Sequence, residues 1–236
     1  MTYRVLLALV LAILLTACGP AASLGTHYQV FVDGSGSISE LQRAHWKARL
    51  LNFSDRFRQG DAVTIRKIHA NTASAEAVYA SDSPAVSDGA PYDEVSSAQE
   101  KFGEMIAGYR TNIEQVLSES STSPETDLFS VVDRVEKDAD HVPVVVVVSD
   151  MLQSTKGVDF EKLVLADQTI SEVIQTTARN HSWMNTQLAG VRVICLLPSL
   201  DGRPVRQTNS RQALKRFWET LFRTLGAQLE RFDTEL

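Results

Sequence analysis

The chain contains little cysteine and no concentration of positive charge. Only Cys18 and Cys195 are cysteines among its 236 residues, so the sequence is not that of a disulfide-rich scaffold. It carries 23 lysines and arginines against 29 aspartates and glutamates, for a formal net charge of −6. No basic run or basic face is present, which argues against a nucleic-acid-binding protein. We expect the scattered acidic residues to lie on a solvated surface.

The sequence also lacks an apolar run long enough to cross a membrane as a helix. The unbroken apolar run Val5–Leu15 has eleven residues, whereas a spanning helix needs about 20. With Arg4 ahead of it, this run is typical of the core of a signal peptide. We therefore expect residues 1–17 to be removed from the mature protein and residues 18–26 to form its N-terminus and a short linker.

The end of that apolar run resembles the cleavage site of bacterial lipoproteins. Leu15, Thr16 and Ala17 precede Cys18 directly. The resemblance implies that Cys18 becomes the lipidated N-terminus and anchors the protein in a membrane of the bacterial cell envelope, either the outer membrane facing the periplasm or the cell membrane. An ordinary secretory signal followed by a chance cysteine is the alternative. Cys195 lies in an apolar, strand-like run, where we expect a small buried side chain and not a nucleophile.

A polar loop follows the first strand-like stretch of the mature chain. Residues 28–32 favour a β-strand, and the sequence Asp33-Gly34-Ser35-Gly36-Ser37 comes next, ahead of a helical pattern. Open α/β sheets place their ligand sites at the carboxyl ends of strands. One carboxylate and two hydroxyls in such a loop are hard oxygen donors, which suit a small cation such as Mg²⁺.

The spacing Asp33-x-Ser35-x-Ser37 resembles the signature of von Willebrand factor A-type (VWA) domains, which carry a metal-ion-dependent adhesion site. The resemblance implies two further ligands, a threonine from a later loop and an aspartate at the end of another strand. Thr126 fits the first role by its place in the chain, with Thr122 as the alternative, although the glycines typical of the family do not precede it. Asp150 fits the second role, because it follows the β-branched run Val144–Val148.

Apolar periodicity predicts an α/β fold with a doubly wound, mostly parallel sheet of about five strands, one antiparallel edge strand, and helices on both faces. We expect a single VWA-like domain over residues 27–236. Its strands are predicted at 28–32, 62–68, 73–79, 143–148 and 191–197. Its helices are predicted at 39–58, from about 96 to 117, at 125–137, within 158–189, and at 211–229.

Motifs that would indicate an enzyme are missing around the same loop. A hydrolase nucleophile elbow needs G-x-S-x-G, but Gly34 and Gly36 flank Ser35 directly. No lysine follows these glycines as in a phosphate-binding P-loop, and no Cys/His cluster predicts zinc. We therefore expect no enzymatic activity and no small-molecule substrate.

The resemblance implies a protein-binding function that depends on Mg²⁺ or Mn²⁺, in which a protein partner supplies an acidic side chain to the bound cation. Two other hypotheses remain open on the same residues. One is a metal-dependent phosphohydrolase, and the other is a structural scaffold domain that binds no metal.

Overall fold

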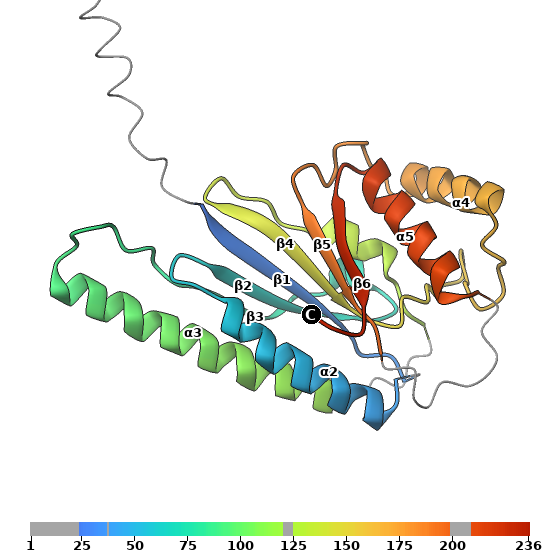
Figure 1. Cartoon of the computed structure of the whole chain (residues 1–236). Helices are drawn as coiled ribbons and strands as arrows, with labels where there is room; N and C mark the ends of the chain where they lie inside the picture. The colour runs from blue at the N-terminus through green and yellow to red at the C-terminus, as the bar shows by residue number, and fades with distance from the viewer. Residues whose placement is uncertain (1–23, 37, 120–124, 199–208) are drawn as a thin grey trace, which may run out of the picture.

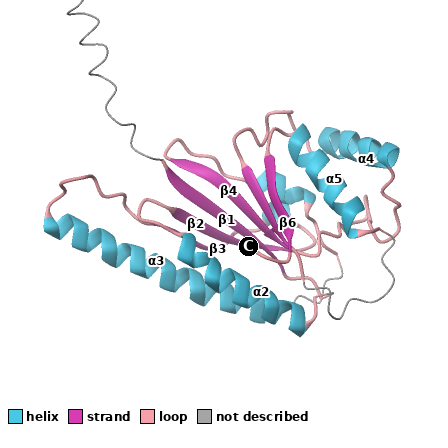
Figure 2. Cartoon of the chain, viewed as in Figure 1, coloured by secondary structure: helices cyan, strands magenta, loops and turns pink. Residues whose placement is uncertain are grey.

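Six strands form one sheet in the computed structural model, which describes residues 24–36, 38–119, 125–198 and 209–236. The strand order is β3-β2-β1-β4-β5-β6, and only β3 runs antiparallel to its neighbour (Figure 2). The strands are β1 (Gly25–Asp33), β2 (Ala62–Ile68), β3 (Ala77–Asp82), β4 (His141–Val148), β5 (Arg192–Leu196) and β6 (Gln228–Asp233). The predicted α/β class, the mostly parallel sheet and the antiparallel edge strand are confirmed.

Helices cover both faces of the sheet, as expected for a doubly wound fold. The helices are α2 (Glu40–Phe53), α3 (Tyr92–Ser118), α4 (Asp167–Asn180) and α5 (Arg211–Thr224). Helices α2 and α3 lie side by side on one face, and α4 and α5 lie on the other (Figure 1). Each pair packs on its own apolar cluster, so the sheet separates two cores.

Strand β4 is central because its side chains are apolar on both faces. Val145 and Val147 belong to the core beneath α4 and α5, whereas Val144, Val146 and Val148 belong to the core beneath α2 and α3. A strand without a polar side has no solvent-facing position in a sheet and is stable only between two layers. Its register with β1 pairs Val32 with Val148. The carboxyl ends of β1 and β4 are therefore level.

The prediction of about five strands was wrong by one, because the last helix is shorter than its periodicity indicates. Helix α5 ends at Thr224, and Gly226 follows with φ +87°, a left-handed conformation that commonly terminates helices. The chain then reverses and adds β6 parallel to β5. Residues 228 and 229, assigned to the helix from the sequence, are thus part of an edge strand.

Other elements also differ from their predicted bounds. The first helix stops at Phe53, where a 3₁₀ turn (Ser54–Arg56) begins. The strand predicted at 73–79 forms at Ala77–Asp82, and α3 begins at Tyr92, ahead of its predicted start at about residue 96. Apolar patterning predicts that Leu41, Trp46, Leu50 and Phe53 form the buried stripe of the first helix. The last three are buried, but Leu41 is 59% exposed and its neighbour Gln42 is buried in its place.

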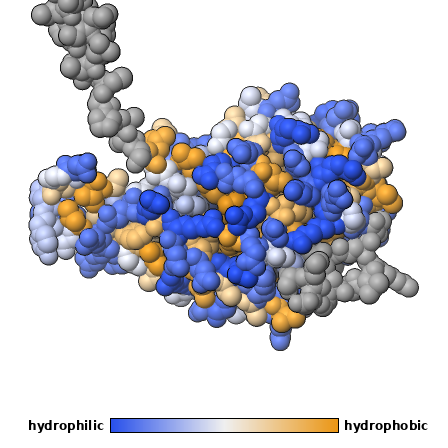
Figure 3. Space-filling model, viewed as in Figure 1, coloured by the Kyte–Doolittle hydropathy of each residue, from blue (hydrophilic) through white to orange (hydrophobic). Residues whose placement is uncertain are grey.

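Few large hydrophobic side chains are exposed among the described residues. On the face drawn in Figure 3, hydrophilic residues predominate and hydrophobic ones lie in small separate groups. None of the helices in the described part of the chain combines the length and apolar composition that a membrane crossing requires.

Cys195 is fully buried, as predicted, and its burial raises the pKa of the thiol. The expected signal peptide and Cys18 lie outside the described residues.

Candidate functional site

Asp33 ends β1 and is almost completely buried, with 3% of its surface exposed. Its Oδ1 accepts a hydrogen bond from the Ser35 backbone N–H at 2.9 Å. Its Oδ2 accepts one from the Ser149 hydroxyl at 2.7 Å. Ser149 follows β4, so this contact joins the loops at the ends of two neighbouring strands. The carboxylate is thereby fixed in one orientation at the carboxyl edge of the sheet.

Burial has the largest effect on the ionisation of Asp33 and raises the pKa of its carboxyl above the ordinary value. Hydrogen bonds from Ser35 and Ser149 and the positive charge of Arg43 act in the opposite direction. A buried carboxylate is costly to ionise without a nearby positive charge. A cation beside Asp33 would reduce that cost.

Asp150 follows Ser149 directly and is partly exposed. Its Oδ1 accepts a hydrogen bond from the Leu152 backbone N–H at 3.0 Å. Since β1 and β4 are adjacent and in register, Asp33 and Asp150 both lie at the same edge, one residue beyond Val32 and two residues beyond its partner Val148.

Met151 follows Asp150, and its backbone has φ +63°, in the left-handed region that glycine favours. Two hydrogen bonds and the burial of its side chain hold this conformation. The Met151 N–H donates to the Ser149 hydroxyl at 3.0 Å, its carbonyl accepts from Trp218 Nε1 of α5 at 3.0 Å, and its side chain is buried. The loop that carries Asp150 is therefore fastened both to Ser149 and to α5.

Thr126 lies over the end of β1, but not at the start of a helix as predicted. Its backbone forms a two-bonded bridge with Ser154, at 2.9 Å and 3.0 Å, and the next N–H, of Asp127, donates to the His69 carbonyl at 3.1 Å. Ser154 belongs to the loop after β4, and His69 comes just after β2. Because β1 lies between β2 and β4, the segment that joins these two loops crosses the end of β1.

The helix predicted at 125–137 is reduced to a 3₁₀ helix at Phe129–Arg134. The physical reason is that the Thr126 carbonyl, which in a helix would accept from the Ser130 N–H, accepts from the Ser154 N–H instead. The Ser130 N–H and hydroxyl both donate to the Asp127 carboxylate. Thr126 itself is buried, with 4% of its surface exposed.

Four of the predicted metal-site residues thus belong to three segments that meet at one edge: Asp33 and Ser35 after β1, Thr126 in the crossing segment, and Asp150 after β4. Ser35 is buried, with 1% of its surface exposed. Ser37 and the alternative Thr122 lie outside the described residues. Ser149 was not among the predicted site residues, although its position between a buried strand and Asp150 could have indicated a place at the site.

The donors at this edge fit a small hard cation by their chemistry. Carboxylate and hydroxyl oxygens are the ligands that Mg²⁺ and Mn²⁺ take, whereas nitrogen and sulfur ligands suit zinc and copper. Among the described residues, no group of three or more His, Cys, Asp or Glu side chains is placed to hold a metal ion. A site of two carboxylates and several hydroxyls belongs to a different class from such clusters.

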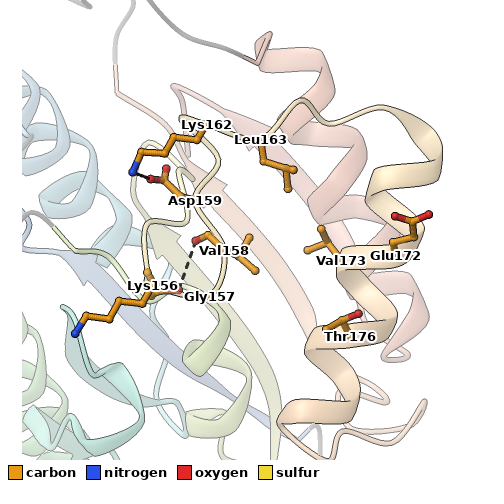
Figure 4. Close-up of a pocket in the computed structure, with 10 residues that line it drawn as sticks. Lys156, Gly157, Val158, Asp159, Lys162, Leu163, Glu172, Val173 and Thr176 are labelled. Carbon is orange, nitrogen blue, oxygen red and sulfur yellow. Dashed lines mark hydrogen bonds and ion pairs between the residues drawn. The ribbon is translucent and has the colours of Figure 1, made fainter.

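A separate cavity of about 550 Å³ lies between the loop after β4 and helix α4. Val158 and Leu163 from the loop and Val173 from α4 approach one another across it, and Lys162 pairs with Asp159 at 2.6 Å on the loop side (Figure 4). The described residues that line it include none of the predicted metal ligands. The cavity is therefore distinct from the candidate metal site.

Comparison with known proteins identifies no family. No protein-family model matches the sequence, and no curated protein does. Solved structures with similar folds include the conserved hypothetical protein BatB from Bacteroides thetaiotaomicron (TM-score 0.42, 13% identity, 89% of this chain and 92% of that chain). Another is the PilB minor pilin from Streptococcus sanguinis (TM-score 0.44, 12% identity, 91% of this chain and 58% of that chain). A third is the human COPII-coat protein Sec24c (TM-score 0.39, 13% identity, 93% of this chain and 31% of that chain). At these scores and identities, the similarities support no conclusion about function.

Proposed function

We propose that this chain is a VWA-type adhesion domain that binds a protein partner through a divalent cation, Mg²⁺ or Mn²⁺. The observation that carries the proposal is the Asp33 carboxylate, which is buried, oriented by Ser35 and Ser149, and overlaid by the segment of Thr126. The bond from the Ser35 N–H is that of an Asx turn, which is also found in purely structural loops. The feature that favours a cation site is the burial of the carboxylate, since a bound cation would offset the cost of ionising it there.

The roles of the residues follow the family resemblance. The hydroxyls of Ser35, Ser37 and Thr126 would hold the ion, while Asp33 and Asp150 would balance its charge and orient the hydroxyls by hydrogen bonds. A bound cation would supply an open coordination position for an acidic side chain of the partner. Hydroxyls are neutral ligands and leave most of the ion's charge available to that side chain.

The direction of β1 supports a site that faces away from a lipid anchor. The strand begins at Gly25, seven residues along the sequence from the proposed anchor at Cys18, and ends at Asp33 on the opposite edge of the sheet. Its nine residues span about 30 Å. A partner bound at the edge of the sheet where Asp33 lies would therefore contact the protein on the side remote from the membrane of the cell envelope.

Metal-dependent capture of the partner tests this function. The full chain, solubilised in detergent and immobilised, would be exposed to a cell-envelope extract with Mg²⁺, with chelator, and with Mg²⁺ restored. We expect a partner that is retained only with Mg²⁺ and is lost from the variant Thr126→Val, which keeps the side-chain shape and removes the hydroxyl.

Two outcomes would support the other hypotheses. Retention of the same partner after chelation would favour a scaffold domain that binds no metal. Mg²⁺-dependent hydrolysis of p-nitrophenyl phosphate by the wild-type chain, but not by Asp33→Ala, would favour a phosphohydrolase and contradict a purely binding function.

A further inference from the structure

Arg43 of α2 lies beside the loop that carries Asp33 and Ser35. The start of α2 is fixed by a reciprocal capping pair, in which the Ser39 hydroxyl accepts from the Gln42 N–H and the Gln42 side chain accepts from the Ser39 N–H. From the next position, the Arg43 guanidinium turns back and donates from Nη2 to the Ile38 carbonyl at 2.7 Å. Since the Ile38 N–H donates to the Ser35 carbonyl at 3.4 Å, the guanidinium is tied to the end of the candidate metal loop.

The charge of Arg43 is not paired with a carboxylate of any residue that the structure describes. Six other arginines do form ion pairs with acidic side chains: Arg49, Arg66, Arg110, Arg192, Arg211 and Arg216. A guanidinium has five N–H donors, and the bond to Ile38 uses one. Arg43 therefore retains donors and positive charge next to a place proposed for a cation.

Two positive charges in one place repel each other, so an arginine here weakens cation binding unless an anion lies between them. Arg43 is near enough for its charge to act on Asp33, which places it within electrostatic reach of the same site. A carboxylate has two oxygens and can contact a cation and a guanidinium together. Such a bridging anion turns the repulsion into a favourable arrangement.

The surface beside Arg43 has room for a side chain of that kind. Glu40, Arg43, Leu117 and Ser118 line a hollow of about 260 Å³ between α2 and the end of α3. This volume is below the range of about 300–1,000 Å³ typical of pockets for drug-sized ligands. The hollow suits a single inserted side chain, and the Glu40 carboxylate on its rim would disfavour a second acidic group.

We propose that Arg43 determines specificity for an acidic partner: its guanidinium binds the free oxygen of the carboxylate whose other oxygen occupies the open position of the cation. This inference rests on the proposed metal-dependent function and identifies a residue that selects the partner. It predicts selection of carboxylates over neutral oxygen ligands, since the planar guanidinium matches the two oxygens of a carboxylate.

Acetate and Mn²⁺ are suitable probes, because paramagnetic Mn²⁺ broadens the methyl proton resonance of an acetate bound next to it. The full chain in detergent would be titrated with Mn²⁺ and then with acetate, as wild type and as Arg43→Gln, Arg43→Lys, Glu40→Gln and Arg49→Gln. Arg49 lies on the same helix but pairs with Glu235, so Arg49→Gln is the matched control.

We expect Arg43→Gln to bind Mn²⁺ at least as tightly as the wild type and to bind acetate about tenfold or more weakly, as for the loss of a hydrogen bond between charged groups. Arg43→Lys should fall between them, because it keeps the charge but not the two-pronged geometry. Glu40→Gln should bind acetate more tightly, and Arg49→Gln should match the wild type.

The outcomes separate this inference from the function on which it rests. If all chains bind Mn²⁺ and acetate broadening is equal in wild type, Arg43→Gln and Arg43→Lys, the role of Arg43 is refuted and the metal site stands. If the wild-type chain takes up no Mn²⁺, both are refuted. If Arg43→Gln melts at a lower temperature than the wild type, acetate binding by Arg43→Lys tests the role of Arg43 in its place. Weaker acetate binding than by the wild type supports that role, and equal binding refutes it.

Discussion

Ser149→Ala is the substitution that most directly tests how the candidate site is held together. The Ser149 hydroxyl is completely buried, donates to Asp33 Oδ2 at 2.7 Å, and accepts from the Met151 N–H at 3.0 Å. Alanine removes both hydrogen bonds and adds no replacement. Asp33 then lacks one donor and the Met151 N–H lacks its acceptor, in a region closed to water.

The expected cost follows from these two losses. A hydrogen bond to a charged group contributes about 1.5–3 kcal/mol, and an unsatisfied buried N–H costs about 1 kcal/mol or more. Ser149→Ala should therefore lower the free energy of unfolding by about 3 kcal/mol. It should also weaken Mg²⁺ binding by about 10–100-fold, the usual effect of removing a group that orients a metal ligand.

Urea unfolding followed by tryptophan fluorescence measures the first effect, with unchanged dependence on urea concentration as the check that the same transition is observed. Ser118→Ala is the matched control, because the Ser118 hydroxyl is exposed and bonds only within its own helix, to the Gln115 carbonyl. That variant should stay within about 0.5 kcal/mol of the wild type. An equally small effect for Ser149→Ala would show that the Asp33–Ser149 contact does not hold the site.

Three further substitutions test other parts of the structure. Burial lowers the pKa of His27, although the negative charges of Glu136 and Asp138 act in the opposite direction. As the pH drops below about 6.5, the unfolded chain therefore takes up a proton before the folded chain does, and the free energy of unfolding should fall. In urea titrations from pH 8 to 5, His27→Gln should lose part of this pH dependence, and the control variant His45→Gln in α2 should keep it. At Met151, with φ +63°, glycine should give a chain about 1 kcal/mol more stable than alanine does, the reverse of the usual order in a helix, and equal stability of the two variants in thermal melts would argue against strain at this residue. Glu136→Gln should cost about 1–2 kcal/mol in urea unfolding, because it removes the half-exposed partner of the buried Arg66; no loss would mean that Arg66 is stabilised by other groups.

The sequence predicts the fold best where one physical requirement dominates. The run Val144–Val148 has no polar face, so it must lie in the centre of a covered sheet, and it does. Prediction was less accurate where tertiary contacts decide. The apolar periodicity of 211–229 gave no sign that Gly226 ends α5 and leaves room for β6. Leu41 fits a helical stripe by spacing but lies about one position from the buried face.

The candidate site shows the same division. Motif spacing singled out Asp33, Ser35 and Asp150, because each lies at a strand end or within two residues of one. The role of Thr126 as a bridge between the loops after β2 and β4 was not predictable, since the bonds that set it involve His69 and Ser154, distant in sequence. Ser149 and Arg43 were missed for a related reason. The contacts of Ser149 with Asp33 and of Arg43 with the Ile38 carbonyl depend on side-chain directions that only the folded chain defines.

Calorimetric titration of Mg²⁺ into the full chain, as wild type and as Asp33→Asn, tests the central proposal most directly. We predict saturable uptake of one ion by the wild type, and an increase in unfolding free energy of about 2.7 kcal/mol once Mg²⁺ reaches a hundred times its dissociation constant. Asp33→Asn should fold and take up no ion. Equal uptake by the two chains, or none by the wild type, would contradict the proposal that this edge of the sheet binds a cation.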